Sequence, residues 1–346
     1  MAGISVAVPV PRVSRIRVTR TLRGLRRNSL FIISVFILAI VVLAGILASW
    51  ISPHDPRNGE LSDKNIPPVW YGQEFVSKTV VDQVELGKRK EQISLREARK
   101  LKEDVVLGEQ VSAPVAKGGS WNQVLGTDHL GRDIFSRIIH GARISLIVAA
   151  VTLGVGGVIG TVLGLVSGWY GGWIDELIMR VVDIFLSLPL ILVALVLVVS
   201  LGQSFAILVT VLVLFMWVRF ARLVRGEVLR LKTMDYVALA RVAGASTPRI
   251  LFVHLLPGVT NTVIVIATLQ VGVVILLESS LSFLGAGVPP PTPAWGSMVA
   301  DGRDRLAEAW WISTMPGLAI LLTVMALNLF GDWLRDTLDP RLRQME

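Results

Sequence analysis

Long stretches without charged side chains constrain this chain more than any other feature of its sequence. No residue from Ile184 to Val218 is charged, and this stretch far exceeds the roughly 20 residues that a helix needs to cross a bilayer. Only 17% of all residues are charged, against about 25% in soluble globular proteins. The sequence therefore predicts a membrane protein with several spanning helices.

The boundaries of the charge-free stretches predict six spanning helices. They lie at about 30–51, from just after Arg143 to near Gly168, and at about 178–201, 205–222, 258–281 and 310–331. The first apolar run exceeds the roughly 7–15 residues of a signal-peptide core, so we expect it to remain as a helix. Gly202 to Ser204 offers a turn between the third and fourth helices, and Pro189 is expected to kink the third.

Basic residues are distributed unevenly between the predicted loops, which indicates the orientation. The N-terminal arm, 1–28, contains seven arginines and no acidic residue, and the 219–254 loop is also rich in arginine. The positive-inside rule places this loop and both termini in the cytoplasm. The net charge of +8 is then a topology signal, and we expect no nucleic-acid partner. Segment 52–142 contains nearly equal numbers of basic and acidic residues. It can lie outside despite its basic residues, because long loops translocate largely regardless of charge.

These patterns predict an all-α integral membrane protein with an extracytoplasmic insert between helices 1 and 2. Its parts are a basic cytoplasmic N-terminal arm (1–28), a first transmembrane helix (29–51), an insert with a pre-span segment (52–142), a five-helix core (143–334) with a cytoplasmic loop at 219–257, and a cytoplasmic tail (335–346). In the insert, charged residues at i,i+4 spacing predict a helix from Asp82 to Asp104. The insert is either a solvated spacer or a docking surface for a soluble partner.

Motifs for catalysis and for metal binding are absent from the sequence. The chain contains no P-loop, no H-E-x-x-H and no G-x-S-x-G motif, and it has no cysteine. His129 and His140 share the outer segment without the spacing of a metal site. We therefore predict no catalytic residue, no metal site and no cofactor bound by this chain.

Two carboxylates are predicted at or near membrane depth, where an ionisable group usually faces a cavity or a partner. Glu278 either lines a solute path together with Ser279 and Ser282, or forms structural hydrogen bonds. Asp183 is expected at the cytoplasmic interface, paired with Arg180 or capping its helix. The two acids do not form an obvious proton relay, which counts against a proton-driven carrier.

Four glycines recur every four residues in the second predicted span, at positions Gly156, Gly160, Gly164 and Gly168. They share one helix face, because the α-helical period brings such positions together. Small residues on one face let another helix backbone approach closely in lipid. This face is either a static packing surface or a moving interface.

A short polar and basic segment, 235–257, lies between two strongly apolar ones. It predicts a helix from Tyr236 to Val242, a stop at Gly244, a turn from Ala245 to Pro248 and a return to the bilayer that ends at Pro257. One face of the helix and its stop presents three residues spaced by four, namely Tyr236, Ala240 and Gly244. We interpret this face as a contact ridge for a soluble partner.

This segment resembles the cytoplasmic EAA loop of importer-type ABC permeases, whose pattern is E-A-A-x3-G-x9-I-x-L-P. Gly244 and the pair Leu256–Pro257 stand at the matching positions, and Ala240 matches the third position of the motif. Ala238 stands in place of the glutamate, Leu239 in place of the second alanine, and His254 in place of the isoleucine.

Three further stretches are similar to C-type subunits of dipeptide and oligopeptide permeases. They are L-G-T-D-H-L-G-R-D at 125–133, S-F-L-G followed by P-P and P-A-W-G at 282–296, and N-L-F-G-D-W-L-R-D followed by L-D-P-R at 328–341. The resemblance covers about 29–55 and 122–343, and the four motifs occur in the expected order. It implies the type I ABC importer permease fold and a transmembrane subunit that is not itself an enzyme.

The resemblance also implies partners, a location and site residues. The partners are a homologous second permease in a heterodimer, two cytoplasmic ATPases that hold ATP and Mg²⁺, and an extracytoplasmic solute-binding protein, assembled in a prokaryotic inner membrane. The implied ATPase-coupling residues are Asp235, Tyr236, Ala238, Ala240, Arg241, Gly244, Ala245 and Ser246. Glu278, Ser279 and Ser282 are assigned to the translocation pathway, and Pro290, Trp295 and Gly296 to docking of the binding protein.

Peptides are the implied solute, although nickel and oligosaccharide importers share this architecture. Two alternatives from other classes stay open at this point. One is a channel or secondary carrier that works without ATP. The other is an assembly or sensing protein that uses the outer insert as a receptor.

Overall fold

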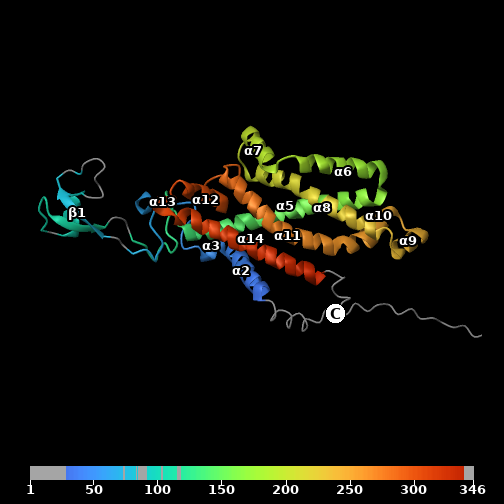
Figure 1. Cartoon of the computed structure of the whole chain (residues 1–346), viewed down its shortest axis with the longest axis horizontal. Helices are drawn as coiled ribbons and strands as arrows, with labels where there is room; N and C mark the ends of the chain where they lie inside the picture. Colours follow the sequence, from blue (N-terminus) through green and yellow to red (C-terminus); the bar gives the residue numbers. More distant parts are fainter. Residues whose placement is uncertain are drawn as a thin grey trace, which may run out of the picture.

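The computed structural model describes residues 29–72, 75–82, 84, 92–102, 104–114 and 118–338. The predicted N-terminal arm and most of the C-terminal tail lie outside the described residues. The longest of the described helices run side by side, with a small sheet at one end of the molecule and α9 (Asp235–Val242) at the other (Figure 1).

Eight helices form the main body of the described chain. They are α2 (Ser29–Ile46), α3 (Ala48–Ile51), α5 (Ile134–Tyr170), α6 (Gly172–Ser187), α7 (Leu190–Leu201), α8 (Phe205–Leu231), α11 (Leu256–Phe283) and α14 (Trp311–Leu338). Shorter helical elements connect them, namely η1 (Leu61–Asp63), α4 (Leu95–Leu101), α10 (Thr247–Arg249), the π-helical turn η2 (Ile250–Leu255), α12 (Trp295–Arg303) and α13 (Leu306–Ala309).

The mostly helical membrane fold is confirmed, but the count of six spans is not. Among the described residues, four helices are long and apolar enough to cross a membrane: α5, α8, α14 and the continuous helix Thr247–Phe283. A fifth span results if α6 and α7 are counted as one bent pair. The first predicted span is a shorter apolar helix, Leu30–Ile46, because the helix breaks at Leu47 before α3 begins.

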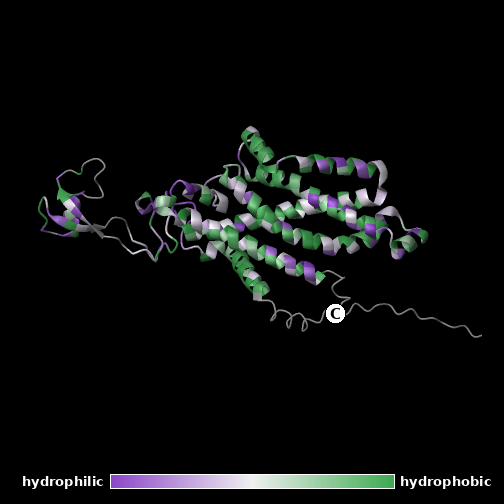
Figure 2. Ribbon diagram, viewed as in Figure 1, coloured by the Kyte–Doolittle hydropathy of each residue, from purple (hydrophilic) through white to green (hydrophobic). Residues whose placement is uncertain are grey.

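Hydropathy follows this arrangement. Hydrophobic residues cover α2, α7 and the middle of the long helices, whereas polar residues gather in the small sheet and near α9 (Figure 2). Many large apolar side chains point outward, including Phe36, Ile46 and Val199. Such a surface suits lipid or a partner subunit, since a soluble monomer rarely exposes large apolar patches.

Pro189 separates α6 from α7, and the two helices are bent by 82° at this break. Proline cannot donate a backbone hydrogen bond, and it pushes the preceding residue out of the helical region. Leu188 is accordingly extended, with φ −82° and ψ 131°. The predicted kink is therefore confirmed, and it is a complete interruption of the helix.

Glycines bring the backbones of α5 and α8 into contact. A Cβ atom added at Gly160 would lie 2.2 Å from the carbonyl oxygen of Trp217, and one at Gly164 would lie 2.7 Å from that of Ala221. Gly156 and Gly168 also face α8, so the predicted glycine face is confirmed as a packing surface. Side chains larger than hydrogen would force the two helices apart.

The insert between α3 and α5 contains a three-stranded sheet, so the all-α prediction is wrong for this segment. Strand β1 (Phe75–Val81) lies between β2 (Gln92–Ser94), which is parallel to it, and β3 (Gln110–Pro114), which is antiparallel. The predicted helix from Asp82 to Asp104 is also wrong, because only α4 is helical in its described part. The three strands, α4 and the segment after α4 share a small apolar core, made of Val80, Ile93, Ala98, Val105 and Val111.

A buried charge network ties the pre-span segment to the main body. The carboxylate of Asp128 accepts from Arg132 at 2.7 Å and from Arg137, and Arg132 also reaches Asp301 at 3.3 Å. Burial opposes the ionisation of Asp128, but Arg137 and Arg132 outweigh it and hold the pKa of this carboxyl below its usual value. The network fixes the start of α5, to which Arg137 belongs.

Candidate functional site

Helix α9 is a separate short helix at the end of the bundle opposite to the insert (Figure 1). It begins at Asp235, whose charge suits the positive end of the helix dipole. Val237 is buried and packs with Leu231, Ile250 and Leu255, which come from α8 and from the π-helical turn η2. One apolar side chain therefore seats α9 on the two elements that flank it.

The end of α9 is a Schellman motif, as the glycine predicted. Gly244 has φ +77°, in the left-handed region that favours glycine. Its N–H donates to the carbonyl of Arg241 at 3.0 Å, and the N–H of Ala245 donates to the carbonyl of Ala240 at 3.1 Å. These two bonds fix the direction in which the chain leaves α9.

The return to the bilayer differs from the predicted turn. The turn ends at Ser246, and Pro248 lies in the first turn of α10, where its missing N–H has no helical partner to lose. From Thr247 the chain runs as one helix to Phe283, with η2 immediately before Pro257. Pro257 cannot donate to the preceding turn, and the wider π-helical turn falls where this bond is missing.

The outward side of α9 carries an apolar pair that sequence reasoning missed. Leu239 is 68% exposed and Val242 is 87% exposed, and their i,i+3 spacing places them on one face. Of the predicted ridge, Tyr236 and Gly244 are exposed and Ala240 is half-buried. The sequence does show Leu239 and Val242 as apolar residues within the loop. Whether their side chains face outward depends on which face of α9 is buried through Val237, and the sequence does not show that.

The remaining predicted coupling residues surround this pair. Asp235, Ala238, Arg241 and Ser246 are exposed, and Ala245 is half-buried. The guanidinium of Arg241 lies 4.8 Å from the centre of the Trp169 ring, near the end of α5. Lys232, just before α9, donates to the carbonyl of Trp169 at 2.9 Å. Trp169 thus contacts both the start of the loop and α9 itself.

Ion pairs join α6 to α8 beside this corner. Arg225 of α8 donates to both oxygens of Asp175 at 2.5 and 2.6 Å. Asp183 of α6 pairs with Arg222 of α8, whereas Arg180 lies 3.7 Å from Glu176. The predicted pair of Asp183 with Arg180 is therefore wrong, since α8 supplies the arginine.

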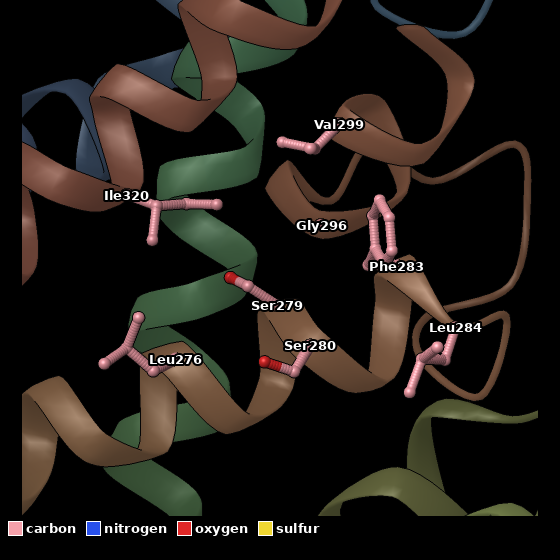
Figure 3. Close-up of a pocket in the computed structure, with 8 residues that line it drawn as sticks. All are labelled: Leu276, Ser279, Ser280, Phe283, Leu284, Gly296, Val299 and Ile320. Atoms are coloured by element: carbon pink, nitrogen blue, oxygen red, sulfur yellow. The ribbon is translucent and has the colours of Figure 1, made fainter. Parts of the chain in front are cut away.

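Glu278 lies on α11 and is wholly buried. Its carboxylate accepts hydrogen bonds from Ser145 of α5 at 3.0 Å, from Ser282 at 2.8 Å and from Ser279 at 3.4 Å. A groove of about 300 Å³ lies beside this cluster. Its lining includes Ser279, Ser280 and Phe283 of α11 together with Gly296 of α12 (Figure 3).

The three predicted docking residues are placed differently from one another. Trp295 is buried and donates from Nε1 to the carbonyl of Ile138 at 2.9 Å. Gly296 is packed so closely that an added Cβ atom would lie 2.0 Å from the carbonyl oxygen of Ser279. Pro290 is exposed, so it is the member of this group that offers a surface in the single chain.

Asp128, His129 and Asp301 bring their ligand-type atoms within 4.8 Å of one another. Sequence spacing could not show this grouping, because Asp301 comes from a distant part of the chain. Both carboxylates already pair with Arg132, whose positive charge opposes a bound cation. The arrangement therefore functions as an ion-pair network in the described structure.

Comparison with protein families decides the classification. The model of the binding-protein-dependent transport system inner membrane component matches residues 160–344, more than half of the chain. The chain belongs to this family. A second model, of the N-terminal transmembrane domain of oligopeptide transport permease C, matches residues 18–68 of this transport component. The resemblance stated from the four motifs is confirmed.

Individual relatives of this inner membrane component cover most of its length. It is 39% identical over 319 residues to the dipeptide transport system permease protein DppC of Escherichia coli (strain K12), covering 92% of this chain and 91% of the relative. It is 42% identical over 227 residues to the di/tripeptide transport system permease protein DppC of Pseudomonas aeruginosa (strain UCBPP-PA14), covering 66% and 75%.

Two further matches complete the comparison. The glutathione transport system permease protein GsiD of Pectobacterium atrosepticum is 46% identical over 227 residues, covering 66% of this chain and 75% of the relative. A solved structure of the MetNI methionine ABC transporter in inward-facing conformations matches with a TM-score of 0.49 at 18% identity. It covers 60% of this chain and 98% of that one.

Proposed function

We propose that this chain is a permease subunit of an ATP-binding-cassette importer that takes up dipeptides and oligopeptides. The observation that carries this proposal is the 39% identity to a dipeptide permease over nearly the whole of both chains. The subunit forms half of the translocation pathway beside a homologous second permease. Two cytoplasmic ATPases hold ATP and Mg²⁺, and an extracytoplasmic protein delivers the solute, so this chain catalyses no reaction itself.

Helix α9 and its Schellman stop form the proposed coupling site. The exposed pair Leu239 and Val242 offers an apolar ridge that fits a groove on an ATPase. Closure of the ATPases on ATP would displace α9, and the Schellman stop would pass the displacement on to the helix that starts at Thr247. Rigid-body rocking of spans around a central path is the general logic of alternating access.

Trp169 extends this coupling site to the α5–α6 corner. It contacts Arg241 on α9 and Lys232 before α9, so a displaced α9 pulls on the end of α5 as well. The adjoining residues Gly171 and Gly172 both have positive φ, and no other atom lies within 4 Å of a Cβ built on either. The backbone turns from α5 into α6 at these two glycines, and the hydroxyl of Ser167 bridges the corner by donating to Asp175.

The orientation follows from the same site. The α9 end of the bundle faces the cytoplasm together with both termini, and the sheet of the insert faces outward. The structure places residues 219–231 of the predicted loop in α8, and the basic residues that support this assignment lie between Arg222 and Arg249, toward the α9 end. Near the outer end, we assign Ser279, which lines the groove, to the wall of the path. Glu278 and Ser282 support it from behind, where the buried Glu278 orients the two hydroxyls. Pro290 is assigned to the surface that meets the binding protein.

Glutathione is a second candidate solute. The observation that favours it is the 46% identity to a glutathione permease, which is a higher identity over a shorter alignment. Glutathione is itself a small peptide-like anion, so competition between labelled dipeptide and glutathione during uptake distinguishes the two solutes.

Reconstitution tests the proposed function directly. The chain, its sister permease, both ATPases and the binding protein are placed in vesicles, and uptake of a labelled dipeptide is measured with and without ATP. We expect uptake only with ATP and all subunits. Uptake by the purified chain without an ATPase would contradict the proposal.

A double variant tests the coupling site in the same vesicles. Leu239→Ser with Val242→Ser should reduce both co-purification of the ATPases and uptake. Leu61→Ser on η1 is the matched control, because it removes the same kind of exposed apolar side chain in the insert, at the end of the bundle opposite to α9. Equal behaviour of the double variant and the control would count against α9 as the ATPase contact.

A further inference from the structure

Three arginines on α8 are spaced by three residues, at Arg219, Arg222 and Arg225, and their partners differ. Arg222 pairs with Asp183 of α6, and Arg225 pairs with Asp175 of α6. Arg219 forms no ion pair with any carboxylate of the described residues. Its guanidinium instead donates to the side-chain oxygen of Gln270 on α11 at 3.3 Å. Arg219 is the farthest of the three from α9, and it has no counter-charge among the described residues.

The position of Arg219 is deep in the bundle. Gln270, which it contacts, lies halfway along α11. The neighbouring residues Trp217 and Phe220 pack against Gly160, in a part of α5 that has no charged residue from Ile144 to Tyr170. Since the side chain extends toward the middle of α11, it does not reach back to the membrane surface as lysine and arginine near helix ends do.

Arg219 is nevertheless exposed in the single chain, whereas Gln270 is buried. A charged side chain is costly against lipid, so in a membrane it faces a water-filled cavity or a partner. The amide of Gln270 also donates to the sulfur of Met216 at 3.8 Å, which orients its oxygen toward Arg219. Arg219 is therefore held in place with most of its five N–H donors still available.

We infer that Arg219, oriented by Gln270, is an anion-binding position in the translocation path that contacts the carboxylate of the transported solute. This inference rests on the proposed import of peptides, which all carry a C-terminal carboxylate unless it is modified. The planar guanidinium matches a carboxylate in geometry and can bind it through two parallel hydrogen bonds. A carboxylate of the second permease is the competing source of the same chemistry, and the experiment separates the two.

The test uses the reconstituted complex with two probes, alanyl-alanine and its C-terminal amide. Each is supplied at a concentration that saturates the binding protein, and uptake by each variant is divided by wild-type uptake of the same probe. In Arg219→Gln we expect a roughly 10-fold or greater loss for alanyl-alanine, the effect of removing one hydrogen bond between charged groups. The amide should lose less than about 2-fold, since it has no carboxylate to bind.

Two further variants complete the design. Arg219→Lys retains the charge but not the two parallel hydrogen bonds, so it should recover only part of the uptake of alanyl-alanine. Arg230→Gln is the matched control on the same helix, because Arg230 is exposed and already pairs with Glu227. It should leave the ratio between the two probes unchanged.

Three results would overturn the inference. Equal losses for both probes, or no loss for either, would show that Arg219 does not contact the solute carboxylate. Failure of Arg219→Gln to co-purify with the second permease would assign its counter-charge to that subunit. If the wild-type complex imports neither probe with ATP, the proposed function fails instead, which is a separate outcome.

Discussion

Gly244 is the residue whose replacement tests the coupling proposal most directly. Its φ of +77° lies in the left-handed region, which costs an L-residue roughly 1–2 kcal/mol and a β-branched residue more. No other atom lies within 4 Å of a Cβ built at this position. In the chain itself, the cost of Gly244→Val therefore arises from backbone conformation and not from a steric clash.

This energy is enough to change the population of the stop. A cost of about 1–2 kcal/mol corresponds to a factor of roughly 5–30 between two conformations. If residue 244 leaves the left-handed region, the bonds from its own N–H to Arg241 and from Ala245 to Ala240 are lost. Helix α9 then keeps its contact with an ATPase but no longer directs the chain toward α10.

The assay is the number of ATP molecules hydrolysed per dipeptide imported by the reconstituted complex. We expect Gly244→Val to raise this ratio about 5–30-fold, because hydrolysis continues while fewer displacements reach the spans. Gly244→Asn should change it much less, since asparagine tolerates the left-handed region. Gly226→Ala on α8 is the control, because Gly226 has an ordinary helical backbone and open space around it.

Two results would refute this reasoning. Normal coupling in Gly244→Val would show that the conformation of the stop does not matter for transport. Equal defects in the asparagine and valine variants would instead indicate that any side chain at this position collides with the ATPase.

Three further predictions concern packing, charge and coupling. Gly160→Ala should destabilise the chain by about 1–3 kcal/mol, because the added methyl group overpacks the contact with α8. Gly154→Ala should stabilise the chain by up to about 1 kcal/mol, because Gly154 has open space around it. Unfolding by denaturant in detergent measures both changes. Asp128→Asn should cost about 3–5 kcal/mol in the same measurement, because two buried arginines lose the buried one of their two carboxylate partners and keep only Asp301. Asp304→Asn should have no measurable effect, because its ion pair with Arg303 is exposed. Trp169→Leu should lower dipeptide uptake per ATP hydrolysed, because it removes the ring that Arg241 covers.

Each of these predictions has a clear contrary result. The packing argument fails if both alanine variants shift stability in the same direction. The charge argument fails if the Asp128 variant is as stable as the Asp304 variant. An unchanged ratio of ATP to dipeptide in Trp169→Leu would exclude this residue from the coupling site.

Sequence reasoning succeeded where the backbone or the bilayer acts locally. Helices α5, α8, α11 and α14 follow from apolar length alone, because a spanning segment must satisfy its own backbone hydrogen bonds. The break at Pro189 and the stop at Gly244 follow from the backbone chemistry of single residues.

Sequence reasoning failed where contacts join distant parts of the chain. Strand β2 has three residues and forms only because β1 is available to pair with it, so a local window showed charges at helical spacing instead. The network of Asp128 with Arg137 and Asp301, and the exposure of Leu239, Val242 and Arg219, depend on how separate helices pack. No local pattern specifies those relations.

The glycine contacts between α5 and α8 have a mechanical consequence. Two helices whose backbones touch cannot roll or slide past each other without collision, so they behave as one stiff rod. The 37-residue α5 begins beside the Asp128 network, while α8 ends beside α9. Under the proposed function, a displacement of the α9 end would therefore reach the start of α5 beside the Asp128 network. In the proposed mechanism the pivots lie at the two breaks in the helices, the glycine corner before α6 and the proline break before α7.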